Sequence, residues 1–80
     1  MNTIGNNIRK FRMLLDIKQA TMAKMLNLSV TSYGKLERNE VKIKQERLNQ
    51  IVKIFGIQEK YIKDLSCFLD AFRDQKHSNS

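Results

Sequence analysis

Apolar residues near the start of this chain recur with the spacing of an α-helix. Ile4, Ile8, Phe11 and Leu15 follow one another at intervals of four, three and four residues, so they share one face of a helix with 3.6 residues per turn. Most residues between them are polar or basic. The pattern predicts an amphipathic first helix that turns these apolar side chains toward a core.

The same spacing predicts four more helices. Two short helices are expected at residues 19–26 and 29–37, on either side of Asn27, which tolerates the left-handed conformation that ends a helix. A fourth helix is expected at residues 45–55, and a fifth starts near residue 58. No alternation of apolar and polar residues typical of a strand persists. The chain is therefore predicted to be all-α.

The apolar stripe continues beyond the fifth predicted helix. We divide the chain into a domain at residues 1–66 and a helical extension with a frayed tail at residues 67–80. The residues that continue the stripe at helical spacing are Leu65, Phe68, Leu69 and Phe72. Such an extension suits a dimer interface, while the alternative, in which Phe68 and Phe72 fold back as extra core, stays open.

Length and composition exclude several classes of protein. A chain of 80 residues holds one ordinary domain, and a large catalytic cleft is not expected in it. No nucleophile–base pair, metal-ligand set or phosphate-binding loop stands out. Cys67 is the only cysteine, so an intramolecular disulfide or a cysteine-based zinc finger cannot form. We expect no enzyme activity, no catalytic residue, no cofactor and no metal.

Membrane insertion and export are not expected either. Apolar runs reach only two or three residues, whereas a membrane helix needs roughly 20. The N-terminal residues lack the charged and apolar regions of a signal peptide. These observations predict a cytoplasmic protein without a membrane partner.

The charge is concentrated in the first two thirds of the chain. The net charge is +7, and residues 1–56 account for it with eleven basic and four acidic side chains, whereas residues 57–80 carry four of each. A basic domain of this size favours a polyanionic partner, above all nucleic acid. If the charge is considered alone, the alternative is that the basic side chains only cover solvated helix faces and bind no partner.

The two short helices joined by a tight turn have the layout of a helix-turn-helix, whose second helix enters the major groove of DNA. Five segments make the likeness specific: IGNNIRKFR at 4–12, QATMA at 19–23, LSVTSYGKLERN at 28–39, IVKIFGI at 51–57 and YIKDL at 61–65. With them the chain resembles the phage repressor/Cro (XRE) family of regulators. The resemblance implies a five-helix lambda-repressor-like domain that binds double-stranded DNA.

The resemblance also implies which residues meet DNA. On the outward face of the third predicted helix, the implied base-reading residues are Val30, Thr31, Ser32, Gly34 and Lys35. The residues implied to contact the DNA backbone are Gln19, Ser29, Arg38, Asn39, Lys42 and Lys44. Val30 and the methyl group of Thr31 suit a thymine methyl, and Lys35 can donate to guanine.

Three further positions carry implications of the same kind. Gln19 is implied to meet a phosphate and to brace the third helix. Arg12 and Glu37 match family positions that form an ion pair between the first and third helices, and the alternative is two exposed charges that never meet. Gly34 is unusual inside a reading helix, where it either permits close approach to DNA or has no function.

The expected function is that of a sequence-specific transcriptional regulator. It would act as a homodimer on a pseudo-palindromic operator, as a repressor. One alternative is an antitoxin-like or anti-repressor module that uses the same fold to bind another protein. A controller protein of a restriction-modification system is a second alternative.

Overall fold

The computed structural model describes residues 4–64, and these residues form five α-helices without a strand. In chain order the helices are α1 (Ile4–Leu14), α2 (Gln19–Met25), α3 (Val30–Glu37), α4 (Gln45–Phe55) and α5 (Glu59–Lys63). The predicted all-α fold is confirmed over this range. The extension at 67–80 lies outside the described residues, and so do the predicted interface residues Leu65, Phe68, Leu69 and Phe72.

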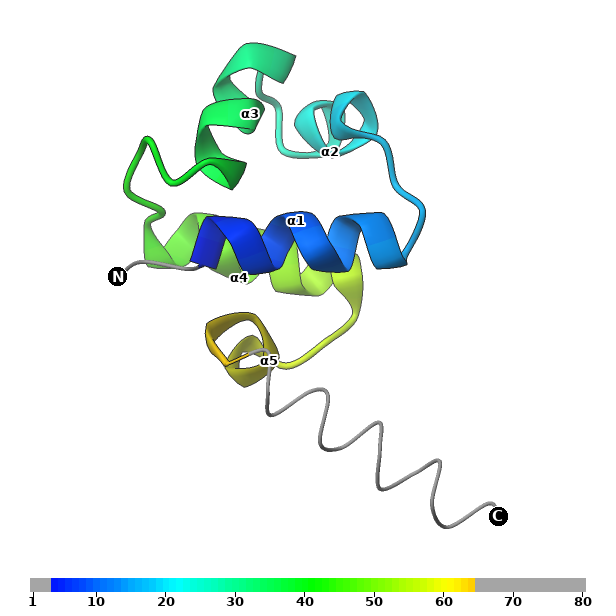
Figure 1. The fold of residues 1–80 in the computed structure, drawn as a ribbon, viewed down its shortest axis with the longest axis vertical. Helices are drawn as coiled ribbons and strands as arrows, with labels where there is room; N and C mark the ends of the chain where they lie inside the picture. Colours follow the sequence, from blue (N-terminus) through cyan, green and yellow to red (C-terminus); the bar gives the residue numbers. More distant parts are fainter. Residues whose placement is uncertain (1–3, 65–80) are drawn as a thin grey trace, which may run out of the picture.

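The helices pack around α1. Figure 1 shows α2 and α3 on one side of α1 and α5 on the other, with α4 running behind it. α1 contacts α3, α4 and α5, while α2 packs chiefly against α3. The pair α2 and α3 therefore forms one end of the molecule, supported from below by α1.

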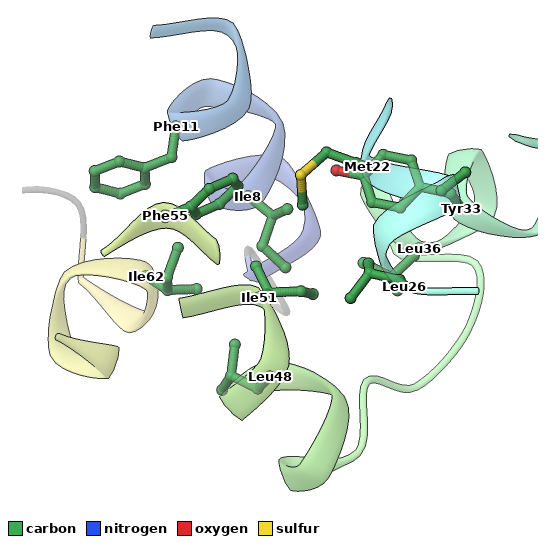
Figure 2. Packing of buried hydrophobic residues seen from close by; sticks show 11 residues of the cluster. Ile8, Phe11, Met22, Leu26, Tyr33, Leu36, Leu48, Ile51, Phe55 and Ile62 are labelled. Atoms are coloured by element: carbon green, nitrogen blue, oxygen red, sulfur yellow. The ribbon is translucent and has the colours of Figure 1, made fainter. Parts of the chain in front are cut away.

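Apolar side chains from all five helices meet in one core (Figure 2). Phe11 of α1 and Phe55 of α4 lie with their ring centroids 6.2 Å apart. The fully buried residues with the largest side chains are Ile8, Met22, Tyr33, Ile51 and Ile62. Since α2 and α3 each contribute to this core, their orientation is tied to the rest of the domain by apolar packing.

One predicted core residue is placed differently. Leu15 was expected to share the buried face of the first helix, but 45% of it is exposed, so that prediction is wrong. The reason is local, because α1 ends at Leu14 and Asp16 adopts a left-handed conformation with φ 58°. The N–H of Leu15 still donates to the carbonyl oxygen of Phe11 at 2.9 Å, so Leu15 keeps the helical register but stands at the very end of the helix, where the chain turns away at Asp16. Asn27 is also left-handed, with φ 58°, as its place between the two short helices predicts.

Two buried or half-buried polar contacts hold the bundle together besides the core. The Asn7 side chain donates from Nδ2 to the carbonyl oxygen of Ile62 at 2.6 Å, which joins α1 to α5. Arg47 donates from Nη1 to the carbonyl oxygen of Leu26 at 2.9 Å, which joins α4 to the end of α2. Both contacts satisfy a carbonyl at or near a helix C-terminus, where the last turn leaves such groups unpaired.

A glycine lets α1 approach α3 closely. The backbone N–H of Gly5 donates to Oδ1 of Asn39 at 2.9 Å. A Cβ atom at Gly5 would stand 2.3 Å from the carbonyl oxygen of Leu36 and 2.9 Å from that of Glu37, far inside van der Waals contact. Only glycine fits at this crossing, and the crossing sets the position of α3.

Candidate nucleic-acid interface

The turn between α2 and α3 is closed by backbone hydrogen bonds. The N–H of Leu28 donates to the carbonyl oxygen of Ala23 at 2.8 Å, across the left-handed Asn27. Ser29 then caps α3, because its Oγ accepts a hydrogen bond from the N–H of Ser32 at 3.1 Å. A serine in this position satisfies one of the free N–H groups at the helix start. The turn and the cap fix the direction in which α3 leaves α2.

One side of α3 is exposed while its other side is buried. Tyr33 and Leu36 point into the core. The exposed residues of α3 that the sequence assigned to base reading are Val30, Thr31, Ser32 and Lys35, and we call them the recognition face. Val30 is an apolar side chain that is 49% exposed. The recognition face thus combines a methyl-bearing surface with hydroxyl groups and one cation, which matches the chemistry of base edges in the major groove.

Gly34 is not part of this exposed surface. It was expected on the outward face, but it is buried because the Arg38 side chain lies across it. Nη1 of Arg38 stands 3.0 Å from the place that a Cβ atom of Gly34 would occupy. The expectation for Gly34 is therefore corrected, since the guanidinium group of Arg38 occupies the space that was assigned to the glycine.

The residues assigned to the DNA backbone fall into two groups. Lys42 and Lys44 are exposed in the segment between α3 and α4. Asn39 is half-buried, has a left-handed φ of 61°, and uses its Oδ1 to hold Gly5. Ser29 is exposed and uses its hydroxyl group as the helix cap. The two lysines are thus available to an external anion, whereas Asn39 and Ser29 also make hydrogen bonds within the domain.

The C-terminal end of α3 is held by a buried ion pair. Nε of Arg12 lies 2.6 Å from Oε2 of Glu37, and Nη2 lies 3.3 Å from Oε1. Nη1 of Arg12 donates to the carbonyl oxygen of Ile17 at 2.7 Å. The Glu37 side chain is 1% exposed and that of Arg12 11%. The pair therefore links α1, the segment before α2, and α3 at one buried point.

Gln19 joins this network at the start of α2. Its Nε2 donates to Oε1 of Glu37 at 2.9 Å. Burial acts to raise the pKa of Glu37, but the hydrogen bonds from Arg12 and from neighbouring polar groups outweigh it, and the pKa is lowered. Glu37 is therefore ionised at neutral pH. Gln19 braces α3 through this carboxylate, and Gln19 itself is half-buried.

Tyr33 brings a hydroxyl group next to the same network. The hydroxyl is buried and has no hydrogen-bond partner of good geometry among the described residues. Burial, together with the neighbouring Glu37 carboxylate, raises the pKa of Tyr33 far above its usual value. The phenol is therefore neutral, and it serves the core rather than any chemistry.

Comparison with known families decides what this arrangement is. A helix-turn-helix family model, HTH_3, matches residues 8–62. The chain belongs to this helix-turn-helix family. The family is of the XRE/Cro/C1 type, has the lambda-repressor-like fold and is typically non-enzymatic, so this is a DNA-binding regulator. No curated protein and no solved structure matches the chain significantly.

Two further features of the helix-turn-helix domain concern other classes of function. Within residues 4–64, none of the helices has the length and apolar character of a membrane span. In the same range no group of three or more His, Cys, Asp or Glu side chains is placed to hold a metal ion.

A groove lined by three basic side chains and one acidic side chain, Glu46, was not predicted from the sequence. It has a volume of about 450 Å³ and lies between the segment after α3 and the start of α4. Its lining includes Lys42, Lys44 and Arg47, together with apolar side chains such as Val41 and Ile43. The lysines were assigned from the family resemblance, but the groove itself was not predicted, because only folding brings Leu28 and Leu36 beside the segment that carries them.

Proposed function

We propose that this helix-turn-helix protein recognises a specific DNA sequence by placing α3 in the major groove. The observation that carries the proposal is the recognition face, an exposed surface on a helix whose other side is buried. A major groove about 12 Å wide admits one α-helix with its side chains. Val30 and Thr31 present methyl groups suited to thymine, and Lys35 presents a donor suited to guanine O6 and N7.

The support of α3 favours this role. A reading helix must be held rigidly, because small displacements of its side chains break hydrogen bonds to bases. α3 is fixed at its start by the Ser29 cap and at its end by the Glu37 ion pair. Along its length Tyr33 and Leu36 anchor it in the core. The domain therefore offers DNA a preorganised surface.

Contacts to the DNA backbone complete the proposed interface. Lys42 and Lys44 lie exposed beyond the C-terminal end of α3, where they can follow one strand. Gln19 and Ser29 lie at the N-terminal ends of α2 and α3, where free N–H groups and the helix dipole favour a phosphate. Such contacts set affinity and register without reading the sequence.

The proposed regulator is a cytoplasmic homodimer that represses transcription at a pseudo-palindromic operator. A two-fold dimer places two reading helices about 34 Å apart, which is one turn of DNA. The proposed interface is the apolar stripe of the C-terminal extension, Leu65, Phe68, Leu69 and Phe72. Bound to its operator, the dimer would block access of RNA polymerase. A titration of operator DNA with the protein should saturate at two chains per operator.

Two kinds of lysine substitution test the assignment of roles. Lys35→Ala is expected to weaken binding by about 1–3 kcal/mol on the preferred sequence and to relax discrimination at one base pair. Lys42→Ala is expected to weaken binding to all sequences alike and to reduce the slope of log K against log salt by about one. Lys44→Ala should behave like Lys42→Ala. The measurement is fluorescence anisotropy on the preferred and a scrambled duplex over a salt series.

The comparison has its own control. Lys53 is exposed in the last turn of α4 and is assigned no DNA contact, so Lys53→Ala should leave both affinities close to the wild-type values. If Lys35→Ala and Lys42→Ala both lowered the affinity for the preferred and the scrambled duplex by the same factor, the placement of α3 in the groove would be wrong.

A further inference from the structure

We propose that Arg38, not Gly34, reads a guanine base from the C-terminal end of α3, and that Gly34 and Glu40 position it. The inference rests on the proposed function, because it adds a residue to the recognition face. Arg38 is the residue that caps α3 at its C-terminus. From the sequence it was expected to contact the DNA backbone, where an arginine would add affinity without reading bases.

The position of Arg38 places it in line with the recognition face. Thr31, Lys35 and Arg38 are separated by four and three residues, so they lie along one face of a helix. All three are exposed. Side chains on a helix lean toward its N-terminus, and the N-terminal part of a reading helix is the part that contacts base edges. The Arg38 side chain reaches back along α3 as far as Gly34, which is the direction of the end of the helix that we place at the bases.

Gly34 provides the space for this path. The guanidinium group of Arg38 covers the glycine, with Nη1 at 3.0 Å and Cζ at 3.8 Å from the place of a Cβ atom. A longer side chain at residue 34 would occupy the same space and displace the guanidinium group. The absence of a side chain in the middle of the helix is thus matched by the arginine one turn later.

Glu40 orients the guanidinium group. Nε of Arg38 donates to Oε2 of Glu40, and both side chains remain at least half exposed. This contact uses Nε, and neither Nη1 nor Nη2 has a hydrogen-bond partner among the described residues. The free end of the guanidinium fork can donate two parallel hydrogen bonds. Guanine O6 and N7 are the acceptor pair that such a fork matches best in the major groove.

The test determines the preferred base at each operator position by selection from a randomised duplex library. Wild-type protein should select a G·C pair at a position that Arg38→Ala no longer selects. In Arg38→Ala the affinity for duplexes with that pair should fall about 5- to 140-fold, while the affinity for duplexes with another pair at that position should change little. Arg38→Lys keeps the charge but lacks the fork, so it should lose most of the same preference.

Gly34→Leu tests the path of the side chain. It should lose the same G·C preference as Arg38→Ala, and the double variant should lose no more than either alone. Leucine favours a helix more than glycine does, so the thermal midpoint should not fall and unfolding cannot explain the loss. Glu40→Gln should weaken the preference while retaining binding.

Two outcomes would overturn the inference and leave the proposed function intact. In one, Arg38→Ala weakens all duplexes by the same factor and lowers the salt slope by about one, as Lys42→Ala is expected to do, which identifies a phosphate contact. In the other, Arg38→Ala binds and selects like the wild type. If the wild type itself selected no sequence, the proposed function would fail, and the inference with it.

Discussion

Glu37→Ala is expected to lower the free energy of unfolding by about 3–5 kcal/mol, because it leaves the Arg12 guanidinium group buried without its partner. The carboxylate it removes also accepts the hydrogen bond of Gln19, so the link between α1, α2 and α3 is lost as a whole. A domain of this size has only about 5–15 kcal/mol of stability. Urea denaturation followed by circular dichroism measures the change.

The control for this substitution is a partly exposed ion pair in the same protein. Glu59 pairs with Lys63 at 2.7 Å on the surface of α5. Glu59→Gln should leave the urea midpoint almost unchanged, because exposed pairs contribute little. Equal effects of Glu37→Ala and Glu59→Gln would show that burial of the Arg12 pair has been assigned wrongly.

The same ion pair predicts a pH dependence. The pKa of Glu37 is lowered on folding from an ordinary value of 4.5, so the unfolded chain binds the proton more tightly than the native one. The stability from this group is complete above pH 4.5 and is lost as the pH falls through the lowered pKa. Glu37→Gln should remove this part of the acid sensitivity. If Glu37→Gln lost as much stability in acid as the wild type does, the acid sensitivity would come from other carboxylates.

Gly5→Ala is expected to destabilise the domain by about 1–3 kcal/mol or more, as overpacking in a close contact does. The new Cβ atom would meet the backbone oxygens of Leu36 and Glu37 at 2.3 and 2.9 Å. Backbone atoms cannot rotate away, so α3 must shift relative to α1. Helix propensity acts in the opposite direction by about 1 kcal/mol, which the clash has to exceed. Thermal and urea unfolding measure the net effect.

A second helical glycine supplies the matched control. At Gly34 the nearest obstacle is the flexible Arg38 side chain, at 3.0 Å from an added Cβ. Gly34→Ala is therefore expected to gain up to about 1 kcal/mol from helix propensity. The two glycine substitutions should change stability in opposite directions. A Gly5→Ala variant as stable as the wild type would contradict the close crossing of α1 and α3.

The helices could be predicted from the sequence because each buries one periodic face. The spacing of Ile8 and Phe11 in α1, and of Leu48, Ile51 and Phe55 in α4, is a local property that survives folding. Periodicity failed at Leu15, because the left-handed Asp16 ends the helix directly after it and leaves Leu15 exposed. Nothing in the apolar spacing indicates a backbone conformation of that kind.

The contacts that position the candidate site were harder to predict. The family resemblance paired Arg12 with Glu37, but spacing alone could not, since 25 residues separate them. The role of Gly5 depends on how closely two helices cross, which no pattern within α1 encodes. The position of Arg38 over Gly34 left a weak signal, a glycine inside a helix followed four residues later by an arginine. Interpreting it required the geometry of the folded helix.

The central claim is that α3 reads a specific DNA sequence. The most direct measurement is fluorescence anisotropy of the wild-type protein on the DNA immediately upstream of its own gene, beside a scrambled duplex, at several salt concentrations. We expect a preference of about 10³-fold or more at about 150 mM salt. If about 6–10 phosphates are contacted, affinity should fall about 10³- to 10⁵-fold between 50 and 200 mM. Equal binding to every duplex tested, with a salt slope near zero, would contradict the claim.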